Sequence, residues 1–467
     1  MTSELFAKYD VHVPRYTSYP TVPAWHAAPT AAQWTASLQR ALTDPSATLS
    51  LYVHLPFCES LCTFCGCNTV ITRDHARSKP YIDRVLRELD IYLQMVPALR
   101  ERRLEQLHLG GGTPTFASAE ELAYLVDGIL SRLATGETHA TEETQRKHSV
   151  SPVSPLWRFT GSVEADPRVT SSAQLSALRE RGFTRLSLGV QDFNDETQRL
   201  VNRIQSPALV ASLVGEARAA GYESINLDLI YGLPGQTPAS MQRLADEVLR
   251  LAPERLAVYS FARVPWIKPR QRKFTDEQIP VASEKRALYD AIRRPLLAAG
   301  YLELGMDHFA LPHDSLARAA VEGTLHRNFQ GYTEARTDAL LGLGVSAISE
   351  TADCYHQNEK VITVYERRID RDEMPTYRGH LLSADDRRRR EQIVAVMTRF
   401  AVTLDDTQAV EARAFLAPLL EDGLAVLEGN VLRVPAAGRA FIRNIATFFD
   451  QYFRAPRPAS PMYSRSI

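Results

Sequence analysis

The sequence has few cysteines, little net charge and no long apolar run, and each of these absences excludes a class of protein. Its 467 residues include five cysteines, which argues against a small secreted domain held together by disulfide bonds. The formal net charge of -1 at pH 7 gives no basic excess for binding nucleic acid or an anionic membrane surface. No uninterrupted apolar run reaches the roughly 20 residues that a membrane-spanning helix needs.

The composition is that of an ordinary folded protein. Hydrophobic residues make up 45% of the chain and charged residues 23%, which is enough for a large core or two domains. The polar start, Met1-Thr-Ser-Glu4, does not resemble a secretory signal. We therefore expect a cytoplasmic protein without a membrane span, and we expect it to be a monomer.

Four of the five cysteines fall within one short stretch, from Cys58 to Cys67. Cys58, Cys62 and Cys65 have the spacing C-x3-C-x2-C, so one loop could wrap three thiolates around a polynuclear metal centre. A 4Fe-4S cluster and a structural zinc ion each normally take four protein ligands. The pattern therefore predicts a cluster with one open iron, where a cofactor or substrate can bind. A zinc site completed by His54 and Cys67, or a set of disulfides, is the alternative.

From about Leu49, short apolar runs alternate with stretches of helical periodicity. Repeated right-handed βα units predict an α/β fold with a parallel sheet that curls into a full or partial barrel. The expected strands are Leu51–Leu55, Gln106–Leu109, Phe159–Val163, Arg185–Val190, Ile225–Ile230, Leu256–Phe261 and Leu302–Met306. The expected helices are Tyr81–Met95, Glu120–Leu133, Ala173–Arg181, Ala208–Ala220, Met241–Leu251 and Glu284–Ala299.

The polar and glycine-rich motifs follow the expected strands. Ligands of such folds bind at the carboxyl ends of the strands, so the motifs should converge on one mouth. The cysteine loop follows the first strand, and the later strands are followed by Gly110–Pro114, Glu164–Pro167, Gln191–Asp192, Tyr231–Pro234, Ala262–Arg263 and Asp307–Phe309.

The two ends of the chain differ from this repeating region, which we assign to residues 36–380. Residues 1–35 form an expected amino-terminal arm, whose Tyr16, Tyr19 and Trp25 would dock on the main body. Residues 381–467 form an expected smaller, helix-rich carboxy-terminal domain.

The carboxy-terminal pattern predicts a winged-helix-like module. A hairpin is expected from Leu424–Leu427 and Val431–Val434, followed by a helix over Gly438–Tyr452. Such modules often bind DNA, but the near-neutral charge favours packing over the barrel mouth. The polar segment Thr135–Leu156 is expected to be a flexible surface loop without an assigned function.

Several of these motifs together resemble a known family. The chain resembles the radical S-adenosylmethionine (radical SAM) enzymes, and among them the oxygen-independent coproporphyrinogen III oxidases, nearly from end to end. The segments that carry the resemblance are Pro14-Arg-Tyr-Thr-Ser-Tyr-Pro20, the loop ending in Cys65-Gly-Cys67, Gly110-Gly-Gly-Thr-Pro-Thr115, Gly189-Val-Gln-Asp-Phe193, Asp228-Leu-Ile-Tyr-Gly-Leu-Pro234, His326-Arg-Asn-Phe-Gln-Gly-Tyr332 and Gly342-Leu-Gly-Val-Ser-Ala-Ile348.

The resemblance implies a radical SAM partial (β/α) barrel in which Cys58, Cys62 and Cys65 hold a 4Fe-4S cluster. S-adenosylmethionine would chelate the fourth iron. The implied contacts of this first cofactor molecule are Tyr52, Gly111, Glu164 and Ile348. Those of a second S-adenosylmethionine are Phe64, Gly112, Thr113, Gln191, Arg203, Asp228 and Ala262. Carboxylates at strand ends also cap the next helix, and this alternative stays open for Glu164 and Asp228.

Three residues near the cluster are candidate catalytic groups. Tyr52 and His54 lie two positions apart on one strand, so their side chains share a face, and His54 is expected beside the sulfonium of the cofactor. Cys67 is expected near the substrate and not on the cluster. A purely structural role is the alternative for both His54 and Cys67. Cys354 is expected to be an inert buried thiol.

The implied reaction starts with a 5'-deoxyadenosyl radical that takes a hydrogen from the β-carbon of a propionate. Loss of carbon dioxide and an electron then leaves a vinyl group, and two such events convert coproporphyrinogen III to protoporphyrinogen IX. The carboxylates of this porphyrinogen need cationic partners, for which Arg15, Arg263 and Arg327 are the candidates. A reducing donor such as a flavodoxin or ferredoxin would supply the electron for radical formation.

A haem-binding chaperone built on the same radical-enzyme core is the main rival. That group carries a different residue at the position of Cys67 and lacks the amino-terminal aromatic arm, whereas this chain has both. The sequence therefore favours the oxidase.

Overall fold

The computed structural model describes residues 3–133, 159–455 and 462–466. The predicted loop Thr135–Leu156 lies outside these described residues. None of the helices within them combines the length and apolar character that a membrane span needs.

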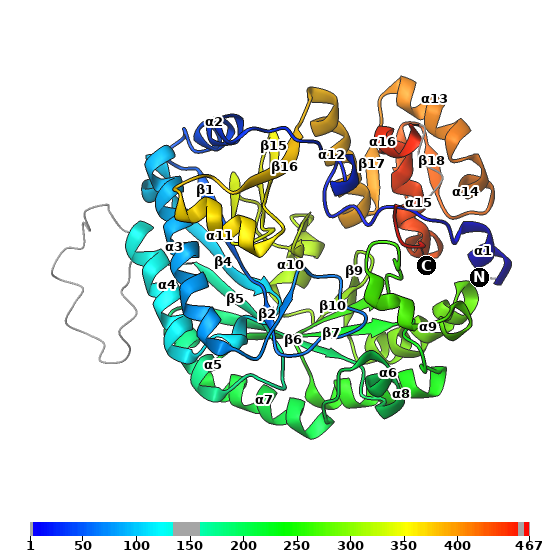
Figure 1. Ribbon diagram of the computed structural model, residues 1–467. Helices are drawn as coiled ribbons and strands as arrows, with labels where there is room; N and C mark the ends of the chain where they lie inside the picture. Colours follow the sequence, from blue (N-terminus) through cyan, green and yellow to red (C-terminus); the bar gives the residue numbers. More distant parts are fainter. Residues whose placement is uncertain (1–2, 134–158, 456–461, 467) are drawn as a thin grey trace, which may run out of the picture.

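A mixed sheet forms the centre of the molecule (Figure 1). Its parallel part confirms the expected βα repetition, because the first six expected strands pair side by side in the order of the chain. These strands are β1 (Thr48–Leu55), β4 (Arg103–Gly111), β5 (Thr160–Ala165), β6 (Phe183–Gln191), β7 (Ser224–Tyr231) and β8 (Arg255–Ser260). β13 (Ala339–Leu343) pairs in parallel with the other edge of β1.

All six expected helices are present, and they lie around the outside of the curved sheet (Figure 1). They bury apolar stripes against it, as a helix with one hydrophobic face does. Their bounds are α3 (Ser78–Met95), α4 (Ala119–Leu133), α5 (Ser172–Arg179), α7 (Pro207–Ala220), α8 (Pro238–Leu251) and α9 (Ala282–Ala298).

The seventh expected strand, over Leu302–Met306, is present in part, but it does not pair with β8. The segment forms the short strand β9 (Leu302–Leu304), which turns back at Gly305 into the antiparallel strand β10 (His308–Ala310). Gly305 has a φ of +63°, a backbone conformation that favours glycine. β10 then pairs antiparallel with β8, so the parallel repeat ends at β8.

The other edge of the sheet carries antiparallel strands that the apolar pattern did not predict. They are β14 (Ile348–Thr351), β15 (Cys354–Asn358) and β16 (Thr376–Leu381), which follow β13 in the order of the sheet. A separate hairpin of β11 (His326–Asn328) and β12 (Gly331–Thr333) lies against the carboxy-terminal helix α12 (Ala384–Arg399).

The amino-terminal arm docks on the main body, as its aromatic residues predicted. Tyr16, Tyr19 and Trp25 are all buried, and Trp25 stacks on Tyr355 of β15. The arm is not wholly extended, because α1 (Ser3–Tyr9) opens it and α2 (Ala31–Ala41) crosses the boundary predicted after residue 35.

The carboxy-terminal region has the element order helix, strand, two helices and hairpin. After α12 come β17 (Ala401–Thr403), α13 (Asp406–Phe415) and α14 (Ala417–Glu421), and then the strands β18 (Val426–Glu428) and β19 (Val431–Arg433). The hairpin was predicted correctly, and β17 joins it as a third strand.

The single helix predicted over Gly438–Tyr452 is wrong. The segment is broken into short turns, of which the longest regular pieces are a 3-10 turn at Ala436–Phe441 and α15 (Ile442–Ala446). Its apolar side chains pack against residues 6–19 of the arm, so the two ends of the chain share one hydrophobic core. Figure 1 accordingly shows both termini on the same side of the molecule.

Candidate active site

The three cysteines of the C-x3-C-x2-C pattern line one cavity of about 410 Å³, which we call the cysteine cavity. The loop that carries them follows β1, and much of the rest of the lining comes from the carboxyl ends of β4 to β7. Arg203 and Arg270, from later loops, also line the cavity. All five cysteines are free thiols. The predicted residues that line this cavity are Cys58, Cys62, Phe64, Cys65, Cys67, Gly111, Gly112, Thr113, Glu164, Gln191, Arg203 and Asp228.

The start of the cysteine loop is fixed to the end of β4. The backbone N–H of Gly112 donates to the carbonyl oxygen of Leu55, and that of Thr113 donates to Phe57. A side chain on Gly112 would collide with the carbonyl of Pro56, so only glycine lets the two backbones approach this closely.

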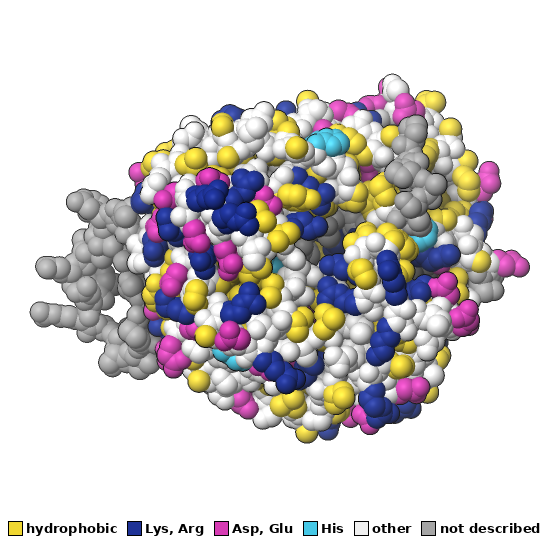
Figure 2. Space-filling view, in the orientation of Figure 1, with side chains coloured by type: hydrophobic (Ala, Val, Ile, Leu, Met, Phe, Trp, Pro, Cys, Tyr) yellow, Lys and Arg dark blue, Asp and Glu magenta, His cyan; other side chains and the backbone are white. Residues whose placement is uncertain are grey.

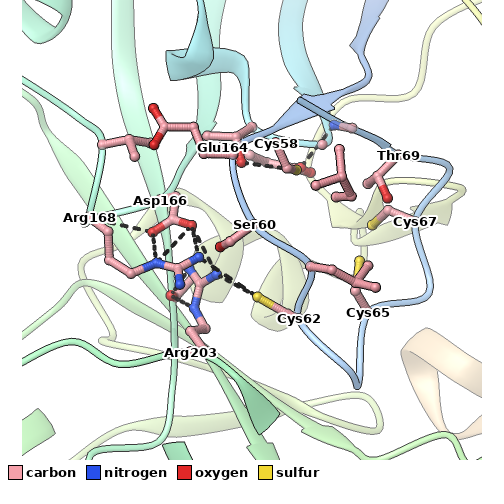
Figure 3. Close-up of a pocket in the computed structure, with 18 of the residues that line it drawn as sticks. Cys58, Ser60, Cys62, Cys65, Cys67, Thr69, Glu164, Asp166, Arg168 and Arg203 are labelled. Atoms are coloured by element: carbon pink, nitrogen blue, oxygen red, sulfur yellow. Dashed lines mark hydrogen bonds and ion pairs between the residues drawn. The ribbon is translucent and has the colours of Figure 1, made fainter. Parts of the chain in front are cut away.

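Cys62 lies against two arginines that come from distant parts of the chain. Its sulfur is 3.5 Å from Nη1 of Arg203 and 3.8 Å from Nη2 of Arg168. Both guanidinium groups also donate to the carboxylate of Asp166. These two cations outweigh the effect of burial and lower the pKa of Asp166. Figure 3 shows this group at the wall of the cavity.

Sequence reasoning missed the contacts of Asp166 and Arg168. Asp166 belongs to the motif Glu164–Pro167, but no spacing rule indicated that it would lie beside Cys62. Arg203 was expected to contact a second S-adenosylmethionine, and in this structure it binds the carboxylate of Asp166.

The remaining thiols have their own neighbours around the cavity. The sulfur of Cys58 lies 3.3 Å from Oγ1 of Thr113, and the thiols of Cys65 and Cys67 interact with each other. Among the described residues, no three His, Cys, Asp or Glu side chains meet closely enough to bind one metal ion. A four-iron cluster spans more space than a single ion, so the spread of three thiols around one cavity fits a cluster better than zinc.

Glu164, at the end of β5, faces both the cavity and the interior of the barrel. Its Oε2 accepts from the backbone N–H of Gly111 at 3.1 Å, and its Oε1 lies 3.3 Å from Nε2 of His108. Although burial opposes ionisation, the contact with His108 and the Gly111 hydrogen bond hold the pKa of Glu164 below its ordinary value. The carboxylate is therefore ionised and able to bind a cationic ammonium group.

Asp228, on β7, lies in a different electrostatic environment from Glu164. Burial and the charge of Glu164 raise the pKa of Asp228 to about 6, against the hydrogen bonds from Asn226 and Ser187. Both carboxylates also line a second cavity of about 150 Å³ inside the barrel, which we call the lower cavity. Neither carboxylate caps the helix that follows its strand in any contact of the described residues.

Tyr52 and His54 share a face of β1, as expected, but neither lines the cysteine cavity. The Tyr52 hydroxyl lies 2.9 Å from Nδ1 of His54, and Nε2 of His54 lies 2.9 Å from the carbonyl oxygen of Asn68. Burial lowers the pKa of His54, so Nε2 of the neutral ring donates to Asn68 and Nδ1 accepts from Tyr52. His54 thus connects β1 to the far end of the cysteine loop.

Ala262 and Ile348 also lie outside the lining of the cysteine cavity. Ala262 is half-buried after β8, and its carbonyl oxygen accepts from the Gln271 side chain. Ile348 begins β14 and packs against the group of Trp25 and Tyr355.

Two of the three candidate arginines surround one buried carboxylate, Asp307. Nη2 of Arg15 lies 3.4 Å from Oδ2 of Asp307, and Nδ1 of His308 lies 2.7 Å from Oδ1. Arg327 stacks over the ring of Tyr332 at 4.4 Å and acts on Asp307 through its charge. His308, Arg327 and Arg15 together outweigh burial and hold the pKa of Asp307 below its ordinary value.

Arg327 has hydrogen-bonding capacity that the protein does not use. It is 7% exposed, and its Nε and Nη1 have no hydrogen-bond partner. Buried polar atoms are nearly always paired, so two unpaired guanidinium nitrogens point to a ligand. His308 and Tyr332, next to Arg327, line the lower cavity together with Glu164 and Asp228.

Arg263 lies in a different environment from the other two. Its guanidinium forms an ion pair with Asp276 and donates to the carbonyl oxygen of Phe274. The structure does not bring Arg263 into contact with Arg15 or Arg327.

The comparisons with a family model and with known proteins agree with each other. The family model of the Radical SAM superfamily matches residues 52–248. The chain is 40% identical to the oxygen-independent coproporphyrinogen III oxidase of Pseudomonas aeruginosa, over 96% of this chain and 95% of that protein. It is 36% identical to the protein of the same name from Synechocystis, over 100% of this chain and 98% of that one.

A solved structure agrees with these sequence relatives. Coproporphyrinogen III oxidase from Escherichia coli, described as a radical SAM enzyme, superimposes with a TM-score of 0.83 at 38% identity. The match covers 94% of this chain and 97% of that chain. The chain therefore belongs to the oxygen-independent coproporphyrinogen III oxidase family of the Radical SAM superfamily.

Proposed function

We infer that this protein catalyses the oxygen-independent oxidative decarboxylation of coproporphyrinogen III to protoporphyrinogen IX. The cysteine cavity carries the inference, because it gathers three free thiols of one loop with the glycine-rich end of β4 and two barrel carboxylates. The near full-length similarity to named oxidases supports the same reaction.

Cys58, Cys62 and Cys65 would hold a 4Fe-4S cluster, and S-adenosylmethionine would bind beside it. When bound, these cofactors supply a carbon-centred 5'-deoxyadenosyl radical that abstracts hydrogen from a substrate propionate. The protein orients the groups and excludes water. The ionised Glu164 provides a carboxylate for the ammonium group of the cofactor, and Gly111 and Gly112 let the backbone approach it.

The remaining proposed cofactor contacts differ in where they lie relative to the cysteine cavity. Phe64, Thr113, Gln191, Arg203 and Asp228 line the same cavity, which supports a second S-adenosylmethionine there. Tyr52, Ala262 and Ile348 would contact cofactor only if it extends beyond the cysteine cavity. For His54, the hydrogen bonds to Tyr52 and Asn68 support a positioning role for the loop more than direct chemistry. Cys67 lines the cavity, which is consistent with a place near the substrate.

Arg15 and Arg327 are proposed to bind a propionate carboxylate of the substrate. The two unpaired nitrogens of Arg327 and the long Arg15–Asp307 contact leave donors available in a buried cationic site. Arg263 remains a candidate, although its terminal nitrogens already have protein acceptors.

The proposal includes a monomeric enzyme in the cytoplasm, where free thiols persist and a flavodoxin or ferredoxin can act as reductant. We also propose that the chain is divided into an arm (1–35), a catalytic barrel (36–380) and a carboxy-terminal module (381–467).

An anaerobic turnover assay tests the function. Protein reconstituted with iron and sulfide, then supplied with dithionite, S-adenosylmethionine and coproporphyrinogen III, should form protoporphyrinogen IX and release two carbon dioxide molecules per substrate. Haem binding without turnover of the porphyrinogen would overturn the proposal in favour of a chaperone.

Arg327→Leu should raise the KM for coproporphyrinogen III by about 10- to 100-fold, since a hydrogen bond to a charged group contributes about 1.5–3 kcal/mol. S-adenosylmethionine cleavage without substrate should be unchanged. Arg336→Leu is the matched control, because Arg336 is highly exposed and has only a weak contact with Glu391. An unaltered KM in the Arg327 variant would remove Arg327 from the substrate site.

A further inference from the structure

The loop between β8 and α9 lies directly against the cysteine loop. Lys268 Nζ donates to the carbonyl oxygen of Cys67 at 3.3 Å, and Gln271 Nε2 donates to that of Phe64 at 3.3 Å. Arg270, between them, lines the cysteine cavity itself. Residues 266–273, which we call the basic loop, are therefore one layer of side chains away from the thiols.

The outer side of the basic loop is unusual for a protein surface. Ile267 is 55% exposed, and Trp266 is 40% exposed although one side of its ring packs edge-on against His12. Four cations follow within six positions, without an acidic residue among them. Arg272 and Lys273 are exposed on the outer side, whereas Lys268 and Arg270 are half-buried toward the cysteine loop and its cavity. Apolar side chains, especially tryptophan, beside a charged rim are typical of the centre of a protein interface.

The local charge differs from that of the whole protein. The chain has a formal net charge of -1, so it has no overall attraction for an acidic partner. On the face shown in Figure 2, Lys and Arg side chains gather around the central hollow. The nearest acidic residues along the chain are Asp276 and Glu277, and Asp276 is paired with Arg263. A local basic patch of this kind steers an acidic protein to one place on the surface.

We propose that the basic loop is the docking surface for a small acidic electron-transfer protein. This inference rests on the proposed function, because the reaction needs an electron to be delivered at the cysteine loop. The reduced donor would lose one electron, and the cluster that Cys58, Cys62 and Cys65 would hold would gain it. No atom is transferred. A loop of eight residues suits the small interface that electron-transfer encounters use.

Binding of a donor protein is the first test, and it requires no turnover. Oxidised flavodoxin should bind the wild-type protein with a Kd that rises with salt. The double variant Arg272→Glu/Lys273→Glu should weaken binding by about tenfold or more and remove most of the salt dependence. Both side chains are exposed, and neither lines the cysteine cavity. The control variant Arg367→Glu/Arg371→Glu reverses two exposed charges on and just after α11 (Ile362–Asp370) and should bind like the wild type.

Electron delivery is the second test. With reduced flavodoxin, the double variant should turn over about tenfold more slowly, and with dithionite it should match the wild type. An unchanged Kd together with an unchanged flavodoxin-dependent rate would overturn the proposal. An equal loss of turnover with flavodoxin and with dithionite would also overturn the proposal. The basic loop would then affect the reaction itself and not the binding of the donor. Should the wild type fail with both reductants, the proposed function fails, while the binding measurement still decides whether the loop is a docking surface.

Discussion

Cys62→Ala should abolish the iron-sulfur absorption of the reconstituted protein and the cleavage of S-adenosylmethionine. Cys62 is a buried member of the C-x3-C-x2-C loop, and its sulfur faces the guanidinium groups of Arg168 and Arg203. Two remaining thiolates cannot hold the cluster, and the variant leaves the two cations without the sulfur they contact. Iron content, the visible spectrum and methionine release measure the loss, and far-ultraviolet circular dichroism should show a folded barrel.

Two other cysteines provide matched controls for this experiment. Cys354 is a buried thiol on β15, outside the cysteine cavity, so Cys354→Ala should keep both cluster and activity. Cys67→Ala should keep the iron content, because Cys67 is not proposed as a ligand. Cluster-dependent activity in Cys62→Ala would refute the three-cysteine assignment.

Arg443→Met should lower the free energy of unfolding by about 3 kcal/mol or more and raise the KM for coproporphyrinogen III. Arg443 is 4% exposed, and it donates to carbonyl oxygens of both chain ends, at Val13, Pro14, Ser464, Arg465 and Ser466. Burial lowers its pKa to about 9, so the side chain is still charged at neutral pH. Each buried carbonyl left without a donor costs about 1–3 kcal/mol.

The effect on KM follows from the position of Arg15 directly after Pro14. When the backbone of the arm is released, Arg15 loses its fixed place beside Asp307. Urea unfolding and substrate titration measure the two effects separately. Arg439→Met is the control, because Arg439 stacks on Phe400 within the carboxy-terminal module and should leave KM unchanged. A normal KM in Arg443→Met would show that the arm does not position a substrate contact.

The parallel part of the sheet could be predicted because its signals are local. Apolar runs that end in glycine or polar residues marked β1 and β4 to β8, and the helices between them have clear apolar stripes. The run Leu302–Met306 looked the same and does form β9, but an apolar run does not encode its pairing partner, and β10 lies between β9 and β8. Gly305 reverses the chain there, and its lack of a side chain leaves room for the Tyr332 ring.

β15 escaped prediction because its buried positions include polar residues. β15 buries His356 and Asn358, whose side chains bond to Thr376, Glu88 and the backbone of Gly344. An alternation of apolar and polar residues cannot reveal a strand whose inward-facing side chains are polar.

For the site, as for the sheet, the sequence predicted features that depend on neighbouring residues and missed contacts between residues far apart in the chain. The spacing of Cys58, Cys62 and Cys65 predicted a single loop, and the three thiols do line one cavity. The contacts of Cys62 with Arg168 and Arg203 join residues more than 100 positions apart, which no motif spacing encodes. The sequence indicated Arg15 and Arg327 by their charge. It did not indicate that the buried carboxylate of Asp307 lies beside them, which the structure shows.

Because the two chain ends share one hydrophobic core, the amino-terminal arm cannot finish folding until the carboxy-terminal end has been synthesised. Tyr9 accepts a hydrogen bond from Asn444, 435 positions later, and Phe6 stacks on Phe441. At about 5–20 residues per second on the ribosome, the arm waits roughly 20–90 seconds for its partners to be made. The aromatic side chains of this shared core, Phe6, Tyr9, Tyr16 and Tyr19, stay unburied through almost the whole of synthesis. A chain that stops short of residue 441 exposes them permanently and leaves apolar surface open to aggregation or to chaperones.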